Sequence, residues 1–226
     1  MKVQHLSEAD HILVTAAVAA AEQHTSGEIV TIVAAQSNDY DDIALVWASV
    51  IAFLAMSAVA LFPDFYRGLY DRLTGGWGYE STANQWLGTV IAVGVVKWIG
   101  MWLILLWRPL RRALTPRAIQ AQRVRARAID LFKVGTEART AGRTGVLLYL
   151  SLAEHRADIV ADQAIAAKVA PETWGEAMAA LIEHVRADRP GEGMAEAVRQ
   201  MGAVLAEHFP RGADDVNELP DRLIEI

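Results

Sequence analysis

The sequence predicts a small α/β domain that is interrupted by a transmembrane hairpin of two helices. Three observations support this fold class. Two long apolar runs, residues 43–62 and 86–107, lie near the middle of the 226-residue chain. Short β-branched segments on both sides of these runs, residues 28–35 and 144–152, are typical of buried strands. Amphipathic segments accompany the strands, so the polar parts of the chain predict a sheet covered by helices.

The composition excludes several classes of function. The chain is 53% hydrophobic with a mean hydropathy of +0.21, which indicates an apolar protein. Its formal net charge of −6 argues against a nucleic-acid binder, because such proteins need positive charge to displace counterions from phosphates. The chain contains no cysteine, which excludes a disulfide framework, a thiolate nucleophile and a cysteine-ligated metal site.

The two apolar runs have the length of membrane spans. Residues 43–62 form a run of twenty residues without a charge. At about 1.5 Å per residue, such a helix crosses the ~30 Å hydrocarbon core of a membrane. Residues 86–107 predict the second span, which contains Lys97 near its centre. The connecting loop, residues 63–85, starts with an amphipathic stretch that predicts a short interfacial helix outside the membrane core.

Arginines near the span ends predict the orientation. The connecting loop holds only Arg67 and Arg72. Under the positive-inside rule, the basic side that follows the second span is cytoplasmic, and both termini lie on it. The arginines nearest that span either bind anionic lipid headgroups or serve only to set the orientation. These three are Arg108, Arg111 and Arg112, and they are followed by Arg117, Arg123, Arg125 and Arg127.

Lys97 has two interpretations. An ionisable group inside a span is commonly part of an ion path or of a polar contact. Alternatively, its ammonium group snorkels to the interface, or contacts Ser49, Ser57 or a second copy of the chain in a homo-oligomer. Neither span contains an acidic residue that would pair with Lys97. Because a relay usually needs several ionisable groups, the structural interpretation is favoured.

The polar segments on either side of the hairpin complement one another. In the first, Ser7 and Asp10 have the spacing of a capping box and predict a helix to about His24, before the strand at 28–35. The later segment predicts a helix at 116–138, a strand at 144–152, an antiparallel strand at 156–161 and amphipathic helices at 172–187 and 193–208.

Neither polar segment makes a domain alone. A single strand that is apolar on both faces needs neighbouring strands and covering helices, and only the segment beyond the hairpin supplies them. The sequence therefore predicts one discontinuous domain made of residues 1–42 and 112–226. The positive-inside rule places both segments on one side of the membrane, as this assembly requires.

Acidic residues mark a candidate site at one edge of the predicted sheet. If the two buried strands run parallel, Asp39 and the pair Glu154–His155 lie at the same edge, where ligand sites of α/β proteins form. Asp158 and Asp162 are further candidates, and Asp162 is expected towards the opposite edge. Carboxylate and carbonyl oxygens suit a hard cation such as Ca²⁺. The alternative is a solvated turn, since acidic residues also favour turns for backbone reasons.

A series of short motifs resembles the TPM domain family, and in particular its bacterial membrane-bound branch. The motifs are SGEIV at residues 26–30, RTGVLL at 143–148, SLAE at 151–154, IVAD at 159–162, LAEHFP at 205–210 and NELP at 217–220. Their order carries the resemblance, which covers nearly all of residues 7–42 and 117–226. It implies a small α/β/α sandwich with a mixed sheet, held in the inner (cytoplasmic) membrane of a bacterium.

The resemblance implies no single activity. Members of the family are linked to phosphatase activity, calcium binding, photosystem repair or receptor modulation. Where better-studied members carry a Gly-Tyr-Gly-rich stretch, this chain has Ala161-Asp162-Gln163-Ala164, and only Asp10 matches their aspartate-rich N-terminal segment. These departures argue against an inherited phosphatase activity.

Two functions remain as hypotheses. The first is a membrane-anchored module in the bilayer that binds a protein partner or helps to assemble an envelope complex on the cytoplasmic side. The second is a metal-dependent hydrolase, such as a phosphatase, which uses the acidic residues at the sheet edge and a metal-activated water. The chain has no hydrolase elbow, P-loop or zinc-protease helix, and its histidines lack metal-ligand spacing. The first hypothesis is therefore favoured, with no catalytic residue assigned.

Overall fold

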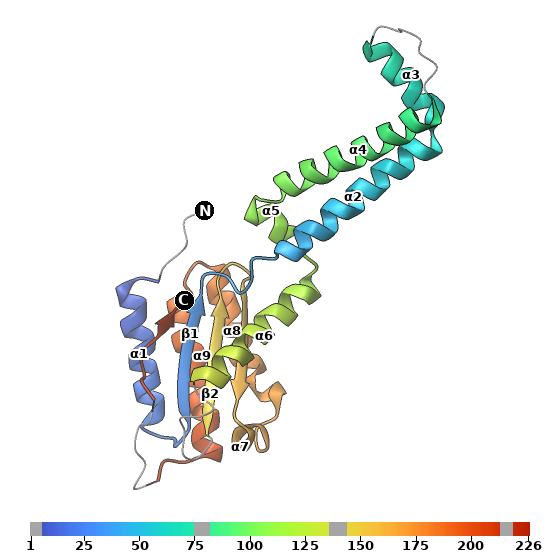
Figure 1. The fold of residues 1–226 in the computed structure, drawn as a ribbon. Helices are drawn as coiled ribbons and strands as arrows, with labels where there is room; N and C mark the ends of the chain where they lie inside the picture. Colours follow the sequence, from blue (N-terminus) through green and yellow to red (C-terminus); the bar gives the residue numbers. More distant parts are fainter. Residues whose placement is uncertain (1–5, 75–81, 136–143, 213–218) are drawn as a thin grey trace. The chain divides into compact units, whose positions relative to one another are not determined.

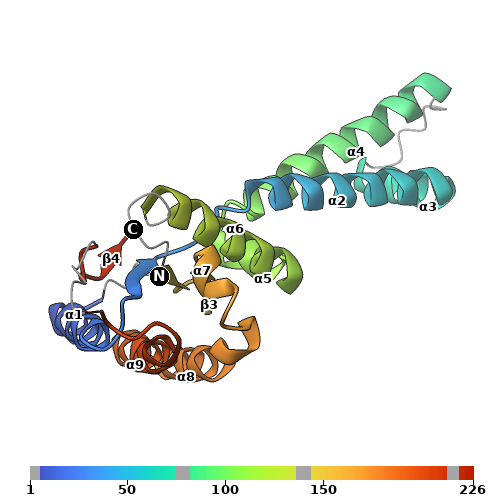
Figure 2. The ribbon, with the colours of Figure 1, turned by 90° about the horizontal axis from the view of Figure 1, so that it is seen from below.

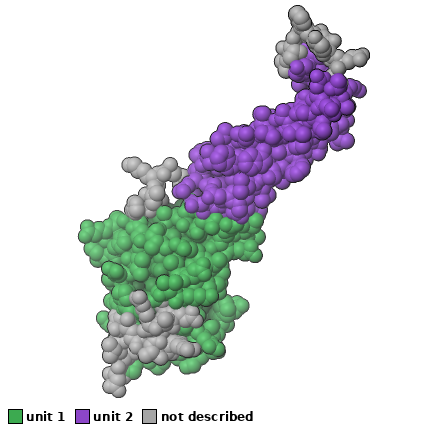
Figure 3. All heavy atoms as spheres, viewed as in Figure 1, with its two compact units in different colours: residues 1–38, 117–226 green, residues 39–116 purple. Residues whose placement is uncertain are grey.

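The computed structural model describes residues 6–74, 82–135, 144–212 and 219–226. The chain divides into two compact units (Figure 3). Unit 1 comprises residues 1–38 and 117–226, and unit 2 comprises residues 39–116. Unit 1 contains a mixed sheet with helices, and unit 2 is helical. The predicted fold class, an α/β domain with an inserted pair of apolar helices, is confirmed.

The sheet of unit 1 has the strand order β3-β2-β1-β4. The strands are β1 (Glu28–Ala34), β2 (Gly145–Ser151), β3 (Arg156–Ala161) and β4 (Ile224–Glu225). β1 pairs in parallel with β2 and with β4, while β2 and β3 are antiparallel. The register places Glu28 opposite Gly145 and Ala34 opposite Ser151. The pairing of β1 with β2 therefore joins segments from the two sides of the inserted helices over the full length of both strands.

Helices cover both faces of this sheet (Figures 1 and 2). α1, α8 and α9 lie on one face and α6 lies on the other, as in an α/β/α sandwich. α1 begins with the predicted capping box, in which Ser7 and Asp10 exchange hydrogen bonds between side chain and backbone. The helices are α1 (Glu8–Glu22), α6 (Arg117–Gly135), α7 (Gln163–Ala166), α8 (Gly175–Arg186) and α9 (Pro190–His208), with a 3₁₀ turn at Pro171–Trp174.

Alternate residues of β1 and β2 belong to different cores. Ile29 and Val33 of β1 pack with α1, α8 and α9, whereas Val30 and Ile32 pack against α6. Every residue of both strands is buried. Successive side chains of a strand point to opposite faces, so a strand covered on both faces must be apolar without alternation. This explains the two β-branched runs in the sequence.

The structure corrects the prediction at one strand and at two helix ends. The polar tail contributes β4, which pairs with β1 and was not predicted as a strand. α9 begins at Pro190, three residues before the predicted start at 193. Proline is tolerated in the first turn because its missing N–H would have no helical partner there. The second apolar helix ends at Ile104 rather than Trp107. In a helix continued through Pro109, the proline ring would clash with the carbonyl of the preceding turn.

Unit 2 is a pair of long apolar helices with two short helices attached. Its elements are α2 (Asp41–Leu61), α3 (Pro63–Thr74), α4 (Ala83–Ile104) and α5 (Arg108–Ala113). α2 and α4 are each long and apolar enough to cross a membrane. Large apolar side chains on them point outwards: Phe53, Leu54 and Val96 are 69%, 61% and 66% exposed.

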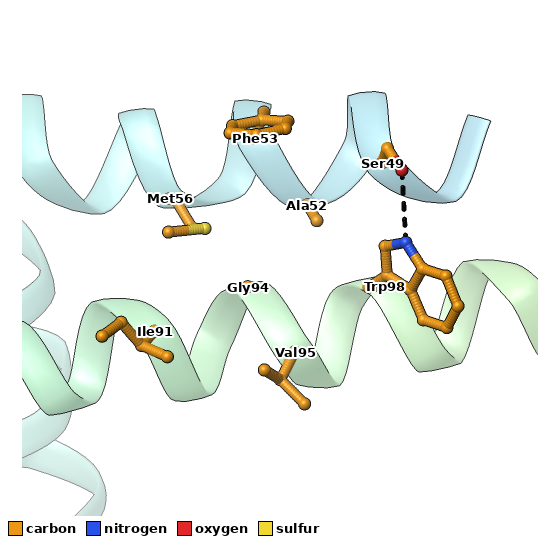
Figure 4. Close-up of a pocket in the computed structure, with 8 residues that line it drawn as sticks. All are labelled: Ser49, Ala52, Phe53, Met56, Ile91, Gly94, Val95 and Trp98. Carbon is orange, nitrogen blue, oxygen red and sulfur yellow. Dashed lines mark hydrogen bonds between the residues drawn. The ribbon is translucent and has the colours of Figure 1, made fainter. Parts of the chain in front are cut away.

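Small residues bring α2 and α4 together (Figure 4). Gly94 of α4 faces Met56 of α2, and a Cβ at position 94 would lie 2.4 Å from the Met56 sulfur. Trp98 also donates a hydrogen bond from Nε1 to Oγ of Ser49 at 3.3 Å. These side chains border an apolar groove of about 360 Å³. Close backbone approach at small residues and polar contacts between helices are typical of packing inside a membrane.

Acidic side chains meet at the amino-terminal end of β1. Glu22, at the end of α1, is buried and accepts a hydrogen bond from the Ile29 N–H at 2.8 Å. Glu28 is also buried and accepts from the Leu219 N–H at 3.1 Å. Burial raises the pKa of Glu22 to about 8, and the negative charges of Glu28 and Asp221 add to this shift.

We predict that Glu22→Gln weakens the pH dependence of stability. The folded state holds a proton on Glu22 that the unfolded chain, with a pKa of 4.5, releases. With respect to this group, the free energy of unfolding is highest below pH 4.5 and falls until the pH passes about 8. The amide of the variant does not titrate, so position 22 then contributes no pH dependence to the free energy of unfolding. Thermal unfolding at pH 5 and pH 8 measures the difference, and equal pH dependence in both proteins would contradict the assignment.

Candidate functional site

The carboxyl ends of β1 and β2 meet at the turn that leads into β3. Glu154 in this turn is only 8% exposed. Its carboxylate accepts hydrogen bonds from the Ser37 N–H, at 3.3 Å to each oxygen, and from the Ser151 hydroxyl. Glu154 therefore links the chain after β1 to the end of β2 through hydrogen bonds, and its carboxylate faces protein donors.

His155 and Arg156 complete the turn. His155 has a φ of 46°, in the left-handed region that side chains other than glycine rarely adopt. Its N–H donates to the Leu152 carbonyl at 3.2 Å, which closes the turn. Arg156, the first residue of β3, donates from its guanidinium to the backbone carbonyl of Arg117 at 3.3 Å. The turn thus contacts the start of α6.

A polar cavity of about 390 Å³ lies beside this turn. Residues of the turn, of α6 and of α8 line it. They are Arg117 and Gln120 from α6, Glu154, His155, Arg156 and Ala157 from the turn and β3, and Ile182 and Arg186 from α8. Its size is within the range of about 300–1,000 Å³ that is common for small-ligand sites. Three arginines and one carboxylate give the cavity a positive charge, although the whole chain carries −6.

The arginines of the cavity differ in their partners from three other arginines of unit 1. Arg125, Arg189 and Arg199 form ion pairs with Asp158, Glu192 and Glu196, respectively. Within the described part of the chain, no such acidic partner is found for Arg117, Arg156 or Arg186. The cavity therefore holds guanidinium groups whose charge is not neutralised by a carboxylate ion pair.

The four predicted metal ligands that belong to unit 1 lie at separate places. Glu154 and His155 lie at the carboxyl end of β2, whereas Asp162 follows β3 at the other end and accepts from the Gly145 N–H at 3.3 Å. Asp158 is paired with Arg125. Asp39 belongs to unit 2, where it pairs with Arg108 at 3.0 Å, whereas Glu154 belongs to unit 1.

The described residues do not offer the ligand set that calcium usually takes. Ca²⁺ takes six to eight oxygen ligands. Among the described residues there is no group of three or more histidine, aspartate or glutamate side chains placed to hold a metal ion. The carboxylate of Glu154, the most buried of the candidates at the carboxyl edge, is occupied by Ser37 and Ser151. No metal-dependent step is therefore assigned to these residues.

The predicted headgroup arginines also have partners within unit 2. Arg108 pairs with Asp39, and Arg111 is buried and pairs with Asp41. The side chain of Arg111 is only 7% exposed, and headgroup binding by these arginines stays a prediction. Arg112 also takes part in an interaction. Lys97 is exposed on α4, and Ser49, one of its proposed contacts, receives the Trp98 hydrogen bond instead.

Comparison with known proteins identifies a solved structure with a similar fold. No family model matches the chain, and no curated protein matches its sequence. Among solved structures, the NMR structure of BA42 protein from the psychrophilic bacterium Bizionia argentinensis matches with a TM-score of 0.57. The fold of this chain is similar to that of BA42. The match covers 100% of this chain and 99% of that chain at 16% sequence identity, so the similarity concerns the fold alone.

We predict that Glu154→Gln destabilises unit 1 without affecting any metal response. An amide nitrogen would replace one carboxylate oxygen that now accepts hydrogen bonds from Ser37 and Ser151. A buried donor left facing another donor costs about 1–3 kcal/mol. The melting temperature measured by circular dichroism should fall accordingly, and added CaCl₂ should leave both proteins unchanged.

Glu192→Gln is the matched control, because Glu192 is exposed and forms only a surface ion pair with Arg189. Such pairs contribute about 0–1 kcal/mol, so this variant should melt close to the wild type. A calcium-dependent rise in the melting temperature of the wild type that Glu154→Gln abolishes would show that Glu154 is a metal ligand after all.

Proposed function

We propose that this chain is a membrane-anchored binding module of the TPM domain type. In this proposal α2 and α4 cross the inner membrane of a bacterium, and unit 1 lies on the cytoplasmic side, where it binds a protein partner. The observation that carries the proposal is the insertion of two apolar helices, exposed along most of their length, between β1 and α6 of a folded α/β unit.

Exposed apolar surface supports the membrane assignment. In the most apolar 18-residue stretch of each helix, only 6% of α4 and 28% of α2 is buried. Apolar surface of this extent is rare on water-soluble monomers but is stable in hydrocarbon. α3 adds Phe65, Leu69 and Tyr70, which are 67%, 42% and 62% exposed. Together with Asp64, Arg67 and Arg72, these side chains give α3 the character of a helix that lies at the membrane surface.

The family assignment rests on sequence order and on the fold. The motifs from SGEIV at residues 26–30 to NELP at 217–220 occur in the order typical of TPM domains. The fold similar to BA42 is compatible with this assignment. A binding role is favoured over hydrolysis, because the acidic residues that a metal-dependent hydrolase would use are engaged with Arg125, Arg108 or backbone donors.

The proposed membrane topology can be tested directly with introduced cysteines. The chain has no cysteine of its own, so a thiol reagent labels only the introduced residue and shows on which side of the membrane it lies. Gly68 in α3 and Gly212 after α9 are both in open space, where a Cβ meets no atom within 4 Å. We predict that a membrane-impermeant maleimide labels Gly68→Cys in intact cells and labels Gly212→Cys only after permeabilisation. The positive-inside rule is the physical reason.

Extraction with alkaline carbonate controls for insertion, because it removes peripheral proteins and leaves integral ones in the membrane fraction. Both variants should stay in that fraction. Release of the protein by carbonate would refute the membrane anchor. Labelling of Gly212→Cys in intact cells would refute the cytoplasmic location while leaving the anchor in place.

A further inference from the structure

We propose that the cavity between α6, α8 and the β2–β3 turn binds a phosphate group, supplied by an anionic phospholipid headgroup or by free phosphate. This inference goes beyond the proposed binding of a protein partner, because it assigns a ligand class to a particular cavity. It rests on Arg117, Arg156 and Arg186, which line one cavity and have no acidic partner among the described residues.

Three separate elements supply these arginines. Arg117 is the first residue of α6, Arg156 is the first residue of β3, and Arg186 is the last residue of α8. The guanidinium of Arg156 is oriented by its hydrogen bond to the Arg117 carbonyl. Guanidinium groups bind phosphate through paired N–H donors, and groups that converge from different elements surround an oxyanion on more than one side.

The unpaired charge distinguishes this cavity from the basic residues near the spans. Arg108 and Arg111, expected from the sequence to contact headgroups, are neutralised by Asp39 and Asp41. An arginine that already pairs with a carboxylate must give up that pair to bind an anion. Among the residues that the structure describes, Arg117 and Arg186 have no such pair to lose.

Of the described residues that line the cavity, Glu154 is the acidic one. Its oxygens accept from the Ser37 N–H and the Ser151 hydroxyl, which stabilise its charge from the protein side. The three arginines still outnumber it, so the net charge that a ligand meets is positive. His155 lines the same cavity and adds a further ring nitrogen as a potential donor.

The connectivity makes a lipid headgroup available as a source of phosphate. Arg117 directly follows Pro116, the last residue of unit 2, so it is the point at which the chain returns from the helices that we propose cross the membrane. Free phosphate offers the same oxyanion without the acyl chains. The shared chemistry is a tetrahedral anion recognised by guanidinium groups.

Thermal unfolding of the full chain in a nonionic detergent tests the proposal. The probes are inorganic phosphate, against chloride at equal ionic strength, and dioctanoyl phosphatidylglycerol, against dioctanoyl phosphatidylcholine. A ligand that binds only the folded state raises its melting temperature, here by about 2–4 °C or more near saturation. The single variants Arg156→Gln and Arg186→Gln should each weaken binding by about 10-fold or more, because each removes charge-assisted hydrogen bonds.

Arg199→Gln is the matched control, since it removes one arginine from an ion pair with Glu196 on α9, away from the cavity lining. It should keep the full response. A response to both phosphate and phosphatidylglycerol supports a site for any phosphate, and a response to phosphatidylglycerol alone supports a headgroup site. No response, or an equal response in all variants, overturns the proposal. Carbonate extraction of the same variants is independent, so the inference can fail while the membrane anchor stands.

Discussion

The parallel pairing of β1 with β2 is the interaction on which the rest of the structure depends. It joins Glu28–Ala34 to Gly145–Ser151 residue by residue, and all fourteen residues lie in the interior. Parallel strands that are buried on both faces need helices on each side, and α1, α8, α9 and α6 supply them. Because the partners come from opposite sides of residues 39–116, the inserted helices must leave and return at compatible positions. The hydrogen bond from Arg123 to the Asn38 side chain, at 2.8 Å, holds those positions together in unit 1.

The same pairing positions the candidate site. It aligns the carboxyl ends of β1 and β2, so that Ser37 can donate to Glu154 across the sheet edge. The turn fixed by Glu154 then places Arg156 beside the start of α6, where the chain re-enters unit 1. The position of the cavity next to the chain connections is thus a consequence of strand order. A ligand bound there would contact α6, the first element of unit 1 after the inserted helices in sequence.

Much of the fold was predictable because its signals are local. The apolar runs predicted α2, α4, β1 and β2, and the spacing of Ser7 and Asp10 predicted the start of α1. β4 was not predictable, because two residues in a polar tail carry no pattern and become a strand only by pairing with β1. The cavity was missed for a similar reason. Arg117, Arg156 and Arg186 are far apart in sequence and resemble ordinary surface arginines until the fold brings them together. The acidic candidates could not be placed from sequence either, because the fold sets each beside its own donor: Asp39 beside Arg108, Asp158 beside Arg125 and Asp162 beside the Gly145 N–H.

The most direct measurement of the central claim is the folding of unit 1 without unit 2. Residues 39–116 would be replaced by a glycine-serine linker of about 20 residues, whose closure costs little more than that of a shorter loop. We predict a soluble protein that melts cooperatively, with slow hydrogen exchange at the amides of Ile29 to Val33. The fragment 117–226 alone, which lacks β1 and leaves an edge of β2 open, should be unstable and prone to aggregation. If that fragment melts cooperatively at the same temperature as the linked protein, the pairing of β1 with β2 does not hold the fold together, and the account is wrong.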